Sequence, residues 1–90
     1  MRCTVVAVAL VVTTLIGPAF AEPNCTSEPK AKWLSESEMK AKIASLGYKF
    51  QIFKVTSGNC YEIYGRDAAG KRIEIYFHPI SGEVVKQHKS

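Results

Sequence analysis

The fold is decided by residues 60–77, which read CYEIYGRDAAGKRIEIYF. Two stretches of alternating apolar and polar residues, 60–66 and 71–78, flank the tetrad Asp67-Ala68-Ala69-Gly70. A period of two is typical of a strand with one buried face. A short loop that opens with Asp and closes with Gly is typical of a hairpin. The segment therefore predicts two adjacent antiparallel strands.

The alternation also assigns the two faces of this hairpin. The side that carries Tyr61 and Ile63 continues on the second strand with isoleucines and a phenylalanine, and we expect it to form the core. The core set should be Ile43, Leu46, Ile63, Ile73, Ile75 and Phe77. The opposite side carries Glu62, Tyr64, Arg72, Glu74, Tyr76 and His78.

A helix is predicted over residues 36–46, before the hairpin. Ser35 and Glu38 have the spacing of a capping box, and Gly47 stands where a left-handed C-cap would be. The apolar residues on one face recur at i, i+4 and i+7, namely Met39, Ile43 and Leu46. A capped amphipathic helix of this kind should pack against a sheet.

The chain on either side of these elements predicts further strands. Residues 48–52 alternate, and Phe53 and Val55 then fall on the opposite parity, which predicts a bulge or a strand buried on both faces near Phe53. Pro79 ends the strand over 71–78, and Val84-Val85 is expected to add a short last strand. The predicted fold is α+β, with one helix packed on a three- to four-stranded antiparallel sheet, preceded by a signal peptide.

The N-terminal segment has the features of an export signal. Arg2 precedes an apolar run over 5–16, and Ala19 and Ala21 are the small residues that a signal peptidase reads. The run is shorter than the roughly 20 residues of a membrane span, so a retained anchor is the weaker interpretation. We expect a signal peptide over 1–21, an extended arm over 22–34 and a domain over 35–90, in a protein that is secreted or periplasmic.

Two cysteines remain when Cys3 leaves with the signal. Cys25 and Cys60 form an even pair in an exported chain that is small enough to need a covalent link. We expect an intramolecular disulfide, with an intermolecular bridge or a free thiol as the alternatives. The chain contains no Cys-x-x-Cys pair, which argues against a redox enzyme.

The charge pattern bears on the class of partner. The formal net charge is +4, and the lysines are scattered rather than gathered into a basic tract. This pattern argues against a nucleic-acid partner. We expect a monomer that does not insert stably into a membrane once the signal is removed.

The region from about residue 33 to residue 85 resembles the PepSY family. The shared features are Leu46-Gly47-Tyr48, the strand Cys60-Tyr61-Glu62-Ile63-Tyr64, the turn Asp67-x-x-Gly70-Lys71, the strand Ile73-Glu74-Ile75-Tyr76-Phe77 and the closing Pro79-x-Ser81-Gly82-Glu83-Val84. The resemblance implies an α+β unit that binds proteins, with inhibition or folding assistance of peptidases as the usual proposal. It implies no catalytic residues. One departure is His78, where family members often have Asp before the proline.

Three groups of residues have side chains that could form a catalytic or metal site. Ser81 and His78 lack an orienting acid, and Ser81 is better explained by its turn. Glu62 and Glu74 share a face like a glycosidase pair, but cross-strand ion pairing is the simpler interpretation. His78 and His88 make a poor metal site because a frayed tail separates them. We therefore expect no enzyme activity, no metal and no cofactor.

The exposed aromatic residues suggest how the protein binds. Tyrosines beside an arginine are frequent anchors of protein interfaces, although they can also merely cover a sheet. We predict a non-enzymatic binding module whose sheet face or edge strand docks onto another exported protein, with a peptidase that it inhibits or regulates as the candidate partner. The predicted contact face consists of Tyr64, Arg72, Tyr76 and His78. The alternative is a small-ligand or metal-binding protein of the cell envelope that uses His78 and the neighbouring tyrosines.

Overall fold

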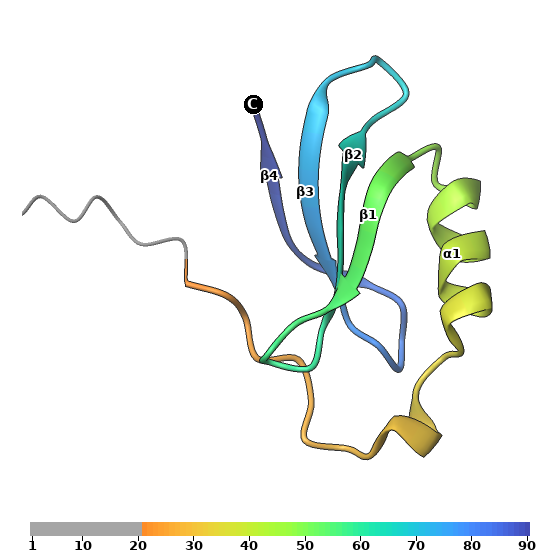
Figure 1. The fold of residues 1–90 in the computed structure, drawn as a ribbon, viewed down its shortest axis with the longest axis vertical. Coiled ribbons are helices and arrows are strands. Elements are labelled where there is room, and N and C mark those ends of the chain that lie inside the picture. The colour runs from red at the N-terminus through yellow and green to blue at the C-terminus, as the bar shows by residue number, and fades with distance from the viewer. Residues whose placement is uncertain (1–20) are drawn as a thin grey trace, which may run out of the picture.

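Four strands form one antiparallel sheet in which each strand pairs with its neighbours in sequence. The computed structural model describes residues 21–90, so the expected signal peptide lies, except for Ala21, outside the described residues. The strands are β1 (Lys49–Val55), β2 (Tyr61–Arg66), β3 (Arg72–Phe77) and β4 (Val84–Lys89), in the order β1-β2-β3-β4 (Figure 1). With α1 (Glu36–Ser45), the one α-helix of the described residues, they confirm the predicted α+β fold.

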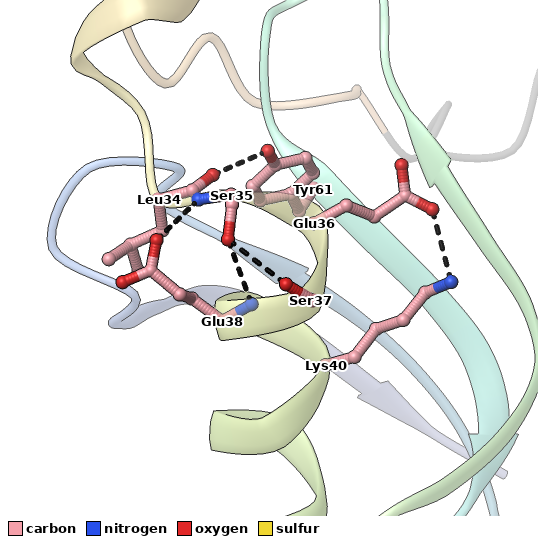
Figure 2. A network of polar contacts seen from close by, with 7 residues as sticks. All are labelled: Leu34, Ser35, Glu36, Ser37, Glu38, Lys40 and Tyr61. Carbon is pink, nitrogen blue, oxygen red and sulfur yellow. Dashed lines mark hydrogen bonds and ion pairs between the residues drawn. The ribbon is translucent and has the colours of Figure 1, made fainter.

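The start of α1 is closed by the predicted capping box. The Glu38 amide donates to the Ser35 hydroxyl at 3.1 Å, and the Ser35 amide donates to the Glu38 carboxylate at 3.1 Å (Figure 2). These reciprocal bonds satisfy backbone donors that have no partner within the helix. The bond from the Ser35 amide also lowers the pKa of Glu38. Gly47 follows the helix with a φ of 89°, a left-handed conformation that suits glycine.

The core lies between α1 and one face of the sheet. From the helix it takes Met39 and Ile43, both fully buried. From β2 and β3 it takes Tyr61, Ile63, Ile73, Ile75 and Phe77. The prediction that Leu46 belongs to this core is wrong, because its side chain is 50% exposed. The helix ends at Ser45, so Leu46 is its C-cap and lies beyond the turn that presses on the sheet.

The N-terminal arm is tied to the β1–β2 turn. The predicted disulfide between Cys25 and Cys60 is present, and the Cys25 amide donates to the Gly58 carbonyl at 2.8 Å. A Cβ at position 58 would collide with the carbonyl of Pro23, so the arm can approach this closely only because residue 58 is glycine. Residues 22–26 therefore lie against the β1–β2 turn, and the arm then leads away from it toward α1 (Figure 1).

The arm then turns through a short 3-10 helix, η1 (Lys30–Lys32), and enters the core. The Trp33 ring meets the Tyr61 ring edge to face with centroids 5.6 Å apart. The Tyr61 hydroxyl donates to the Leu34 carbonyl at 2.7 Å, and the Leu34 amide donates to the Pro79 carbonyl at 2.8 Å. These contacts cover the end of the sheet at which α1 begins.

The change of parity in β1 is a bulge, as predicted. The register with β2 shifts between Phe50 and Ile52, so that Phe50 and Phe53 both pack against the core. Gly65 lies opposite Phe50, and a Cβ there would collide with the Lys49 carbonyl. Glycine at position 65 lets the bulged strand approach β2.

Candidate functional site

The candidate site is the face of the sheet that points away from α1. We call it the outer face. Strand register places its side chains in three rows that run across the strands. The rows are Lys54–Glu62–Tyr76–Lys86, then Ile52–Tyr64–Glu74–His88, and finally Lys49–Arg66–Arg72 at the end next to the β2–β3 hairpin.

The first row has a buried centre. Glu62 is fully buried and Tyr76 is 1% exposed, although both lie on the outer face. The ammonium of Lys54 lies 3.5 Å from the Glu62 carboxylate and 5.3 Å from the centre of the Tyr64 ring. Within residues 21–90, no hydrogen bond of good geometry reaches either Glu62 oxygen. The row thus holds a carboxyl group that has lost its hydration and interacts instead with Lys54, Tyr64, Tyr76 and Glu74.

The carboxyl groups of Glu62 and Glu74, both on the outer face, differ in pKa. Burial raises the pKa of Glu62, and the neighbouring Glu74 raises it further. The Glu62 carboxyl in turn lowers the pKa of Glu74, and the Tyr76 hydroxyl, which donates to Glu74 at 3.1 Å, lowers it as well. A proton taken up by this pair therefore resides on Glu62, and Glu74 keeps its charge.

The Glu62 and Glu74 carboxyl groups also shift the pKa values of the two neighbouring tyrosines. Burial, followed by the contribution of Glu62, raises the pKa of Tyr64 to about 12. Burial and the Glu74 carboxylate raise the pKa of Tyr76 as well. Both tyrosines are therefore neutral phenols at physiological pH.

A groove of about 430 Å³ opens beside this cluster. Its walls include Tyr64 and Arg66 from β2, Arg72 and Glu74 from β3, and His88 from β4. Its volume is within the range that takes a peptide side chain or a small ligand. The groove combines an aromatic surface, two guanidinium groups and one carboxylate.

Only part of the predicted contact face lines this groove. Tyr64 and Arg72 do so, whereas Tyr76 is buried beneath the outer face. His78 follows the end of β3, and its Nδ1 accepts from the amides of Ile80 at 3.1 Å and Ser81 at 3.4 Å. His78 therefore organises the β3–β4 turn. The imidazole must leave Nδ1 unprotonated to accept these bonds.

Three ionisable residues that line the groove are absent from the contact face that the sequence predicts. Arg66 has the same parity as Glu62 and Tyr64, so the alternation of β2 was a sufficient signal for it. Glu74 was placed on the outer face but was interpreted only as an ion-pair partner. His88 comes from β4, which extends to Lys89 and is longer than the strand expected at Val84-Val85.

The comparisons with known proteins agree with this architecture. Residues 5–88 match the family model described as the peptidase propeptide and YPEB domain. The match spans most of the chain, which therefore belongs to the PepSY family. The family is associated with propeptide-like and inhibitor-like regulation of peptidases, and its domains are typically extracellular or periplasmic. No curated protein and no solved structure matches the chain.

Proposed function

We propose that this protein is an exported, non-enzymatic module that regulates a peptidase by docking its outer face onto it. The observation that carries the proposal is the groove on that face, which presents Tyr64 beside Arg66 and Arg72. Aromatic residues and arginines supply most of the binding energy at protein interfaces. On the other face of the sheet, α1 covers β2 and β3 and makes this part unavailable for docking.

Two further observations support this function. A disulfide is typical of proteins that work outside the reducing cytosol, which agrees with a signal peptide over residues 1–21 and a secreted or periplasmic location. Glu62 is fully buried, so a substrate could not reach the only carboxylate that pairs with Glu74 on the outer face of the described chain. This arrangement favours binding over glycosidase-like catalysis. Residues 21–90 also contain no helix long and apolar enough to cross a membrane.

The test uses a photo-crosslinking amino acid at position 51, where Gln51 is exposed and lines the groove without a proposed binding role, and, as a control, at position 32. Lys32 lies on η1, does not line the groove and is mostly exposed. We expect the position 51 probe, expressed with its native export signal, to crosslink an exported peptidase that the position 32 probe does not reach. The purified domain should then change the rate at which that peptidase hydrolyses a peptide substrate.

A double variant, Tyr64→Ala with Arg72→Ala, separates docking from folding. It should lose the effect on the peptidase and keep the circular dichroism spectrum of the wild type. Lys32→Ala should act as the wild type does. If no peptidase is crosslinked from position 51, or if the double variant regulates the peptidase as well as the wild type, the proposed function is wrong.

A further inference from the structure

The row of outer-face residues next to the β2–β3 hairpin has an unusual charge arrangement. Arg66 lies directly opposite Arg72, and Lys49 lies directly opposite Arg66. Like charges in opposite positions of neighbouring strands destabilise a sheet. The other rows are arranged differently, since Lys54 contacts Glu62 and Glu74 shares its row with His88. Three adjacent cations without an acid among them form a surface that favours the binding of an anion.

The described part of the chain does not supply that anion. Lys32, Lys40, Lys54 and Lys89 form ion pairs with acids of residues 21–90, whereas Arg66 and Arg72 form none there. The Arg66 guanidinium donates to the Gly70 carbonyl at 2.9 Å, which holds it over the hairpin and leaves its remaining donors for another group. The Arg72 side chain is exposed and makes no ion pair within residues 21–90.

The nearest acid in the hairpin is already engaged. The Asp67 carboxylate accepts from the amides of Ala69 and Lys71, each at 2.9 Å, and lies 3.6 Å from the Lys89 ammonium. The bond from the Lys71 amide is the main cause of the lowered pKa of Asp67. Asp67 therefore serves the turn and does not neutralise the arginines.

The remaining walls of the groove define which anion fits. A guanidinium donates two parallel bonds to a carboxylate, and two guanidiniums side by side can hold one carboxylate from both sides. Tyr64 offers an aromatic surface next to that position. Glu74, which keeps its negative charge, also lines the groove and repels dianions and polyanions. A single carboxylate on a peptide satisfies all three conditions.

We propose that Arg66 and Arg72 form a carboxylate-binding site for an aspartate or glutamate side chain of the docking partner. The adjoining part of the partner's chain lies against Tyr64. The proposal deepens the docking function above, on which it rests, by naming the chemistry of the partner segment: an acidic peptide rather than a basic or purely apolar one.

The direct test is a titration of the ¹⁵N-labelled domain followed by NMR. The probes are a short, end-capped peptide with one central glutamate, the same peptide with glutamine, and inorganic phosphate. The glutamate peptide should shift the amides of Gly65, Arg66, Arg72 and Ile73, and it should bind about tenfold more tightly than the glutamine peptide. Added sodium chloride should weaken binding of the glutamate peptide.

The matched variants are Arg66→Gln with Arg72→Gln, and Lys32→Gln as a control on η1. The arginine variant should lose the preference for glutamate, and the control should keep it. The arginine variant should not melt below the wild type, because the substitution removes a like-charge pair. Equal binding of the two peptides, a preference that survives in the arginine variant, or tighter binding of phosphate than of the glutamate peptide would overturn the proposal.

The two proposals fail in different ways. If the arginine variant still regulates the crosslinked peptidase as the wild type does, docking stands and the carboxylate site is wrong as part of it. If the glutamate peptide binds as expected but no peptidase is reached from position 51, the carboxylate site stands and the peptidase function is wrong.

Discussion

Removal of the Cys25–Cys60 disulfide should cost a large share of the stability of this domain. The two cysteines are 35 residues apart, so the bridge closes most of the arm, the helix and β1 into one loop. In the chain-entropy model a loop of this length is worth about 4 kcal/mol, because the bridge restricts the unfolded chain. Domains of this size melt roughly 4–8 °C lower for each kcal/mol lost, which predicts a drop of about 15–30 °C.

The folded state of the reduced protein should differ little from that of the oxidised one. In the reduced protein, the backbone amide of Cys25 should still donate to the Gly58 carbonyl, and the side-chain amide of Asn59 should still donate to the Thr26 carbonyl, as it does at 3.1 Å in the oxidised protein. The cost therefore falls mainly on the unfolded state. For the same reason, the denaturant slope m should increase, since the unbridged chain exposes more surface when it unfolds.

The assay is urea unfolding monitored by circular dichroism. It compares the oxidised wild type, the wild type in reductant, and the double variant Cys25→Ala with Cys60→Ala. The free energies of unfolding of the reduced wild type and the double variant should agree within about 1 kcal/mol. The variant should be slightly less stable, because it also loses the buried Cys60 sulfur. A loss below about 1 kcal/mol on reduction, with m unchanged, would refute the argument from unfolded-state entropy.

Three further predictions follow from the packing and the charges. Ile75→Ala should lower the free energy of unfolding by about 2–5 kcal/mol, whereas Leu46→Ala on the exposed C-cap should lower it by less than about 1 kcal/mol; equal losses in urea melts would contradict the placement of the core. Gly65→Ala should lower the free energy of unfolding by about 1–3 kcal/mol, because the alanine Cβ would meet the Lys49 carbonyl. If this variant melts at the same temperature as the wild type, β1 does not approach β2 so closely. Glu62→Gln should raise the free energy of unfolding by about 1 kcal/mol at pH 7. Burial raises the pKa of Glu62 in the folded state, so the wild type loses stability as the pH rises and this carboxyl group ionises, whereas the glutamine variant does not. The gain should vanish below about pH 4, where Glu62 of the wild type is as neutral as the glutamine of the variant. A variant that is less stable than the wild type at pH 7 would show that the ion pair of Glu62 with Lys54 stabilises the fold by more than the burial of the charge destabilises it.

Much of the fold could be predicted because the signals that specify it are local. The capping box depends on two residues three positions apart, and both of its bonds are present. The hairpin depends on alternation around a four-residue loop, and the bulge in β1 on a break in that alternation. The candidate site was less predictable. Alternation placed Tyr64 and Arg72 on the outer face, but it could not show that Tyr76 is buried there.

The sequence by itself determined α1, the strands β1 to β3 and the side of β2 and β3 that faces the helix, because backbone geometry repeats over a few residues. It indicated neither η1 nor the full length of β4. The tertiary structure alone decided which positions on a face lose contact with water. Glu62 and Tyr76 are buried because they lie on the two central strands, between Lys54 on one edge strand and Lys86 on the other. Arg66 and Arg72 became a pair only through the register of β2 with β3. Burial and register of this kind depend on segments far apart in the chain, which no local pattern records.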